Sequence, residues 1–81
     1  MFQENYWRLT VAIDEVDHAE SYYEMRLSLA GSIERVEQIA TYHCFRFSDL
    51  TMTATEAADL INYTGRVGVR RFEARIEEVR R

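Results

Sequence analysis

The sequence predicts an α+β domain in which a three-stranded antiparallel sheet is followed by two helices packed on one face, in the order βββαα. Two observations lead to this prediction. Apolar and polar residues alternate over two stretches near the start of the chain, and apolar residues recur every three or four positions near its end. At 81 residues the chain is long enough for one core, so we expect a single domain, 1–81.

The first two strands are predicted from this alternation. Residues 5–14 and 21–31 each place large apolar side chains on one face and mostly polar side chains on the other, which is typical of half-buried strands. Gly31 and Ser32 then supply a turn. The residues assigned to the core face are Trp7, Leu9, Val11, Ile13, Tyr23, Met25, Leu27 and Leu29.

Residues 33–48 fit two interpretations. Ile33, Val36, Ala40 and Phe47 fit a helical stripe, whereas every second residue from 39 to 47 fits a strand face. The β-branched and aromatic run TYHCFRF favours a strand in the second half. Val36 breaks the alternation, so we expect a bulge or a bent hairpin entry near residues 36–38. We expect the third strand here.

Two helices are predicted after the sheet. Thr53 and Glu56 have the spacing of a capping box, and this helix ends at Gly65. The second helix covers residues 69–79, where four apolar residues follow the helical spacing. A strand would match only the three apolar residues at 72, 74 and 76, so we predict a helix.

The even-numbered residues of the three predicted strands face away from the helices and form a candidate binding surface. Each strand contributes one Tyr and one Arg to it, and cross-strand neighbours on a sheet lie about 4.5–5.5 Å apart. Both residue types are common in binding hot spots, although antiparallel sheets also carry them on faces that meet only solvent. The candidate partner-binding residues are Tyr6, Arg8, Tyr22, Glu24, Arg26, Tyr42 and Arg46.

Composition and charge narrow the classes of function. The net charge is −4 and every basic residue is Arg; residues 1–65 carry −7 and residues 66–81 carry +3. The acidic body disfavours loose binding to nucleic acid, whereas the tail would favour it. There is no apolar run of membrane-spanning length and no signal-peptide pattern, and the single cysteine, Cys44, agrees with a reducing compartment. We expect a cytoplasmic protein.

No catalytic or metal-binding set is apparent in the sequence. His43 is expected on the core face of the third strand and Cys44 on the opposite face, so the two cannot form a nucleophile pair. His18 and the His43–Cys44 pair lack the spacing of zinc ligands. We expect no enzymatic activity, no metal and no cofactor.

The segment GRVG (65–68) raises an alternative function. A Gly-x-x-Gly loop with a basic residue between two helices is similar to the loop with which KH domains approach phosphates. Three strands before both helices do not fit the KH order, and a helix C-cap followed by a tight connection also explains both glycines. The alternative nucleic-acid-binding residues are Gly65, Arg66, Gly68, Arg70 and Arg71.

The predicted layout is an opening strand NYWRLTV, two further strands, a helix beginning at Thr55-Glu56, a Gly-containing loop and the final segment RFEARIEEVRR. In this layout the chain resembles small phage anti-CRISPR proteins that inhibit type I surveillance complexes. The resemblance covers length, element order and short stretches, and its better part is residues 53–81.

This resemblance implies a non-enzymatic inhibitor in the cytoplasm of the host cell. It would bind a Cas effector or surveillance-complex subunit and prevent target DNA binding, without direct contact to nucleic acid or membrane. Members of this family use aromatic and acidic residues of the sheet for contact, but the position of a family tyrosine falls near Ala12 here. The sequence also leaves open a homodimeric accessory protein that pairs through an edge strand or the last helix.

Overall fold

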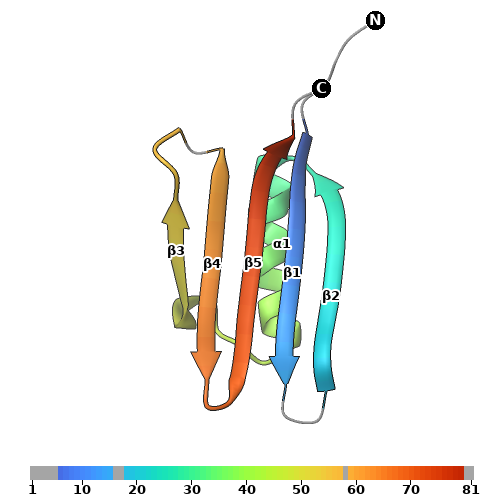
Figure 1. The fold of residues 1–81 in the computed structure, drawn as a ribbon, viewed down its shortest axis with the longest axis vertical. Helices are drawn as coiled ribbons and strands as arrows, with labels where there is room; N and C mark the ends of the chain where they lie inside the picture. Colours follow the sequence, from blue (N-terminus) through green and yellow to red (C-terminus); the bar gives the residue numbers. More distant parts are fainter. Residues whose placement is uncertain (1–5, 16–17, 58, 80–81) are drawn as a thin grey trace, which may run out of the picture.

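A computed structural model of the chain describes residues 6–15, 18–57 and 59–79, with only the backbone described for residue 15 and residues 18–25. These residues form a five-stranded antiparallel sheet with a single α-helix against one face (Figure 1). The strand order is β2-β1-β5-β4-β3, so the first and last strands of the chain lie side by side within the sheet. The elements are β1 (Tyr6–Glu15), β2 (His18–Leu27), α1 (Leu29–Tyr42), the short 3-10 helix η1 (Phe47–Asp49), β3 (Leu50–Ala54), β4 (Leu60–Val67) and β5 (Arg70–Val79).

The core lies between α1 and the central strands. The alternation predicted for the first strand is confirmed, because its odd-numbered residues from Leu9 to Ile13 are fully buried. They face Phe72, Ala74 and Ile76 of β5, which are also buried. The cross-strand pairs at the centre of the core are Leu9–Ile76, Val11–Ala74 and Ile13–Phe72.

Helix α1 begins and ends with capping interactions. The Ser28 hydroxyl accepts a hydrogen bond from the Gly31 N–H at 3.0 Å, as expected for an N-cap serine. At the other end the Phe45 N–H donates to the Ala40 carbonyl at 2.8 Å and the Cys44 N–H donates to the Thr41 carbonyl at 3.0 Å. These two bonds are those of a Schellman motif, which satisfies carbonyls that the helix would otherwise leave unpaired.

The Schellman motif places Cys44 in the left-handed conformation, with φ 64°. Glycine usually occupies this position, because the conformation costs a residue with a Cβ about 1–2 kcal/mol. We therefore expect Cys44→Gly to raise the free energy of unfolding by about 0.5–1 kcal/mol, measured by urea denaturation. Cys44→Ala keeps the Cβ and is the control. An equal gain in both variants would mean that the thiol, and not the backbone conformation, is responsible.

The predicted third strand over residues 33–48 is wrong, because α1 occupies residues 29–42. The helical stripe was the correct interpretation: Val36, Ile39 and Ala40 are buried on the face of α1 that meets the sheet. The TYHCFRF run favoured a strand by composition, yet it covers the end of α1, its cap and the start of η1. Burial of the stripe against the sheet outweighs local β-propensity here.

Both predicted C-terminal helices are also wrong. The segment from Thr53 to Gly65 contains the end of β3, a connection and most of β4, and residues 70–79 form β5. β5 pairs with β1 on one side and β4 on the other, so both of its edges take part in sheet hydrogen bonds. Val69, which completed the apparent helical stripe, is 68% exposed in the turn before β5. The observed order is ββαβββ and not βββαα.

The two glycines of GRVG serve the β4–β5 hairpin. Gly68 is the first residue of its two-residue turn and has φ 63°, which glycine adopts without steric cost. Gly65 lies within β4, where a Cβ would come within 2.6 Å of the Leu50 side chain and 3.0 Å of the Asp49 carbonyl oxygen. Turn geometry and close strand packing therefore account for both glycines.

Candidate functional site

The candidate site is the face of the sheet opposite α1, which we call the open face. It is built by the even-numbered residues of β1, β2 and β4 and the odd-numbered residues of β3 and β5, because side chains alternate along each strand. Its described polar, charged and aromatic residues are Tyr6, Arg8, Thr10, Asp14, Arg26, Thr51, Thr53, Asn62, Thr64, Arg66, Arg71, Glu73, Arg75 and Glu77.

Charges of opposite sign alternate along the centre of the open face. The charged β5 residues facing this side are Arg71, Glu73, Arg75 and Glu77, in that order. The Arg8 guanidinium of β1 donates two hydrogen bonds to Glu77 Oε1, at 2.7 and 3.0 Å. Arg71 and Arg75 each lie two residues from a glutamate on this face of β5, so the central strand presents a mixed rather than a uniformly basic surface.

Three of the predicted partner-binding residues do come together at one end of the open face. The register places Arg8 of β1 opposite Arg26 of β2. The Arg26 guanidinium lies over the Tyr6 ring, 4.5 Å from its centroid, which is a cation–π contact. Tyr6, Arg8 and Arg26 therefore form a contiguous cluster on adjacent strands, as the alternation predicted.

Two further predicted residues lie on β2 beside this cluster. The backbone register pairs Tyr22 with Ala12 and Glu24 with Thr10, both of which belong to the open-face positions of β1. The side chains of Tyr22 and Glu24 lie outside the described part of the structure.

Tyr42 and Arg46 do not lie on the open face, contrary to the prediction. Tyr42 is the last residue of α1, 80% exposed, with its ring edge-on to His43 at 5.2 Å between centroids. Arg46 immediately precedes η1, and its backbone N–H donates to Asp49 Oδ2 at 3.1 Å. Both were assigned to a third strand, whereas Tyr42 ends α1 and Arg46 lies in the connection between α1 and η1. His43, predicted on the core face, is instead the half-buried C-cap of α1.

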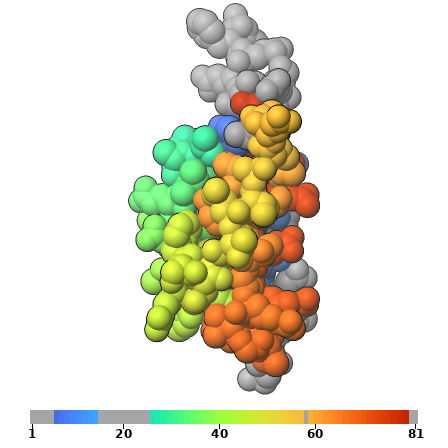
Figure 2. Space-filling view, turned by 90° about the vertical axis from the view of Figure 1, so that its left-hand side faces the viewer, coloured from blue at the N-terminus to red at the C-terminus, as the bar shows by residue number. Residues whose placement is uncertain are grey.

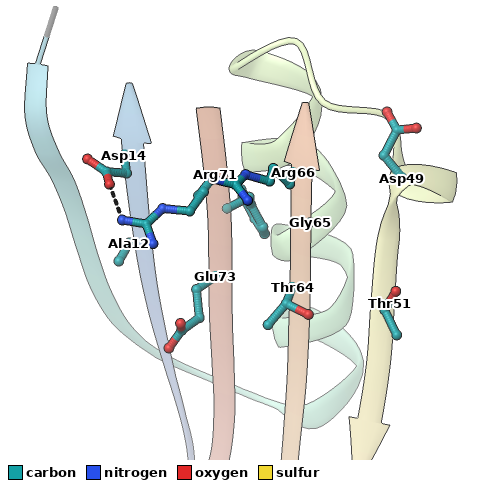
Figure 3. A pocket seen from close by; sticks show the side chains of 10 residues that line it. Ala12, Asp14, Asp49, Thr51, Thr64, Gly65, Arg66, Arg71 and Glu73 are labelled. Carbon is teal, nitrogen blue, oxygen red and sulfur yellow. Dashed lines mark hydrogen bonds and ion pairs between the residues drawn. The ribbon is translucent and has the colours of Figure 1, made fainter. Parts of the chain in front are cut away.

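A hollow opens at the end of the open face near the β4–β5 turn (Figure 3). The Arg71 side chain extends across it to Asp14, with 2.5 Å between Nη2 and Oδ2. Arg66 lies directly opposite Arg71 in the β4–β5 register, and Glu73 and Thr64 form the next row. The hollow therefore combines two guanidinium groups with carboxylates and a hydroxyl, which suits a ligand that carries both hydrogen-bond donors and acceptors.

The residues of the nucleic-acid alternative do not converge on one surface. Arg66 and Arg71 point to the open face, whereas Arg70 lies on the helix side, where its guanidinium is 4.5 Å from the centroid of the Phe45 ring and donates to the His43 carbonyl. Gly65 is packed within β4, and Gly68 forms the hairpin turn. The predicted clamp between two helices is therefore replaced by a β-hairpin.

Sequence reasoning did not place the central part of the open face on a sheet, from Arg71 to Glu77 on β5 and from Asn62 to Arg66 on β4, and it named Arg66 and Arg71 only for the alternative function. A signal for it was present. Charges of alternating sign at every second position from Arg71 to Glu77 have the period of a strand face, and a helix would have distributed them around its axis.

Within residues 6–15, 18–57 and 59–79, no group of three or more His, Cys, Asp or Glu side chains could hold a metal ion. No helix in the same residues is long and apolar enough to cross a membrane. Comparisons of the chain with protein families, curated proteins and solved structures found no match.

Proposed function

We propose that this chain is a non-catalytic binding domain that holds a partner protein against the open face, with Tyr6, Arg8 and Arg26 at the contact. The observation that carries the proposal is the cluster of an aromatic ring and two arginines on a rigid antiparallel sheet. Tyr and Arg contribute large contact area with a polar end, and strands supply a preformed surface that loses little entropy on binding.

The charge distribution favours a protein over a nucleic acid as the partner. Arg8 and Arg71 are bonded to carboxylates, and Glu73 lies between Arg71 and Arg75 on the same strand. Phosphate binding depends on cations that release counterions, and carboxylates beside those cations oppose it. Charges of both signs instead suit a protein surface with the complementary pattern, which gives specificity and orientation.

The partner that we propose to test first is a subunit of a type I CRISPR surveillance complex, which this chain would inhibit as a phage-encoded protein in the host cytoplasm. The support for this partner is the resemblance of the opening strand and the small size of the domain. The C-terminal half contributed most to the resemblance and was predicted to be helical, but its residues 60–79 form the β4–β5 hairpin in the structure. The open face supports binding of a protein partner, and the choice of this particular partner rests on the opening strand and the size of the domain and not on the element order.

The test is a gel-shift titration of a purified type I surveillance complex and its target DNA with this protein. We expect the wild-type protein to abolish the shift of the target DNA and to cause no shift of DNA or RNA by itself. Arg26→Glu should weaken inhibition about tenfold or more, because it reverses a charge and removes the contact with Tyr6. Arg35→Glu makes the same change on an exposed position of α1 and is the control.

Each outcome of this titration has a separate meaning. No inhibition by the wild-type protein would refute the anti-CRISPR proposal. Inhibition that Arg26→Glu leaves unchanged would show that another surface makes the contact. A shift of nucleic acid by the protein alone, lost at higher salt, would favour the alternative function through Arg66 and Arg71.

A further inference from the structure

The edge strand β3 lacks the protection that natural sheets usually give to an exposed edge. It pairs only with β4, so the backbone groups on its other side have no partner strand within the described sheet. Edge strands are commonly protected by charged side chains, proline or bulges. Residues 50–55 read LTMTAT and contain none of these, whereas β2 at the opposite edge carries His18, two glutamates and Arg26 in its sequence.

An apolar surface continues from this edge onto the helix side of the sheet. α1 packs mainly against β1, β5 and β2, whereas the small η1 lies against β4, so α1 does not cover the helix side of β3 (Figure 1). Met52 is paired with the buried Tyr63 but remains 56% exposed itself. Phe47 of η1 is 38% exposed, with its ring 5.5 Å from that of Tyr63 between centroids. Burial raises the pKa of Tyr63, in keeping with this apolar surrounding.

Figure 2 looks directly onto the β3 edge. β3, in yellow, runs along the middle of this side, with α1 in green on one flank and β4 and β5 in orange on the other. No other described segment lies in front of β3 in this view, so another strand could approach along its length.

The strand is close to self-complementary about Met52. Reading outward in both directions, the neighbours of Met52 are Thr51 and Thr53, followed by the apolar Leu50 and Ala54. In an antiparallel pair of two such strands centred on Met52, each Thr51 would face Thr53 of the other copy, and Leu50 would face Ala54. Thr–Thr and apolar cross-strand pairs of this kind stabilise antiparallel sheets.

We propose that this protein forms a homodimer by antiparallel pairing of β3 with β3 of a second copy, centred on Met52. A two-fold axis perpendicular to the sheet then creates one continuous ten-stranded sheet with both α1 helices on the same side. Met52 and Phe47 of both copies meet in the gap between the two helices, where their exposed apolar surface becomes buried. The two open faces become one surface, with a Tyr6–Arg26 cluster in each half.

A second copy fits this edge better than an unrelated strand. Each copy supplies the same uncharged edge strand and the same exposed apolar residues, Met52 and Phe47. A single isologous contact therefore pairs both edges and buries both apolar surfaces, and it closes the assembly as a dimer. This pairing is independent of the proposed function, because the open face lies on the other side of the sheet from Met52.

The first test measures mass in solution by sedimentation velocity from about 1 to 200 µM, a range over which mass action separates monomer from dimer. We expect twice the monomer mass at the higher concentrations. Met52→Lys should raise the dimer dissociation constant about tenfold or more, because it places a charge on the edge and next to its own symmetry mate. Thr41→Lys adds the same charge on the exposed surface of α1 and should leave the dimer unchanged.

The second test fixes the register. In a Cys44→Ser background, Met52→Cys is expected to form a disulfide-linked dimer under mild oxidation, because the two residues face each other across the two-fold axis. Thr53→Cys is the matched control, since its symmetry mate lies diagonally at about 7–8 Å, too far for a disulfide.

The proposal is overturned if the wild-type protein stays monomeric throughout the concentration range, or if Met52→Lys leaves a dimer intact. Preferential cross-linking through Thr53→Cys would refute the register centred on Met52. Because these measurements contain no partner protein, their failure does not affect the proposal for the open face.

Discussion

Replacing Ala74 with arginine is expected to destroy the native fold of this domain. Ala74 is fully buried at the centre of β5, between Val11 of β1 and Tyr63 of β4. An arginine there would need space that the packed core lacks and would bury an unpaired charge, a combination that costs more than about 4 kcal/mol. Circular dichroism and urea denaturation of Ala74→Arg should show loss of the cooperative unfolding transition.

Val69→Arg is the matched control, because it introduces the same side chain five positions earlier at an exposed site in the turn. Its free energy of unfolding should remain within about 0.5 kcal/mol of the wild-type value. The pair also separates the two interpretations of this segment, since a helix would bury position 69 in its apolar stripe. A destabilised Val69→Arg together with a stable Ala74→Arg would contradict the assignment of β5.

The second large effect is expected at Arg70, which ties the β4–β5 hairpin to the end of α1. Its guanidinium lies over the Phe45 ring and donates a hydrogen bond to the His43 carbonyl. Arg70→Met keeps much of the aliphatic packing but removes both interactions. We expect it to lower the free energy of unfolding by about 1.5–3 kcal/mol, measured by urea denaturation.

The neighbouring Arg71 provides the control for this substitution. Its side chain is 63% exposed and pairs with Asp14 on the open face, and exposed ion pairs contribute at most about 1 kcal/mol. Arg71→Met should therefore cost less than Arg70→Met. Equal losses would indicate that Arg70 does not connect the hairpin to the helix.

The sequence was sufficient to predict β1 and its buried face, because the local pattern of this strand agrees with its tertiary environment. The alternation from Leu9 to Ile13 requires one buried and one open face, and a central strand covered by α1 on one side provides both. The prediction of Tyr6, Arg8 and Arg26 on one surface followed from the same period. Which of these residues binds a partner stays a prediction.

The segment RRFEARIEEV could not be assigned in the same way, because its apolar residues fit both periods. Phe72 and Ile76 are four residues apart, a separation that places them on one face of a helix and also on one face of a strand. Its residues are good helix formers, which favours a helix in isolation. In the folded chain, pairing with both β1 and β4 outweighs this helical preference. The local sequence of the segment does not indicate which distant strands it pairs with.

The sequence by itself determined that β1 buries its odd-numbered side chains and that Tyr6, Arg8 and Arg26 share the opposite face. Only the tertiary structure decided that the described chain is mainly a five-stranded sheet, that residues 29–42 form its single α-helix, that residues 70–79 form a central strand, and that Tyr42 and Arg46 lie away from the open face. The physical reason is that strand hydrogen bonds and core burial join residues far apart in the chain. Their free energy outweighs local propensities that differ by about 1 kcal/mol or less per residue.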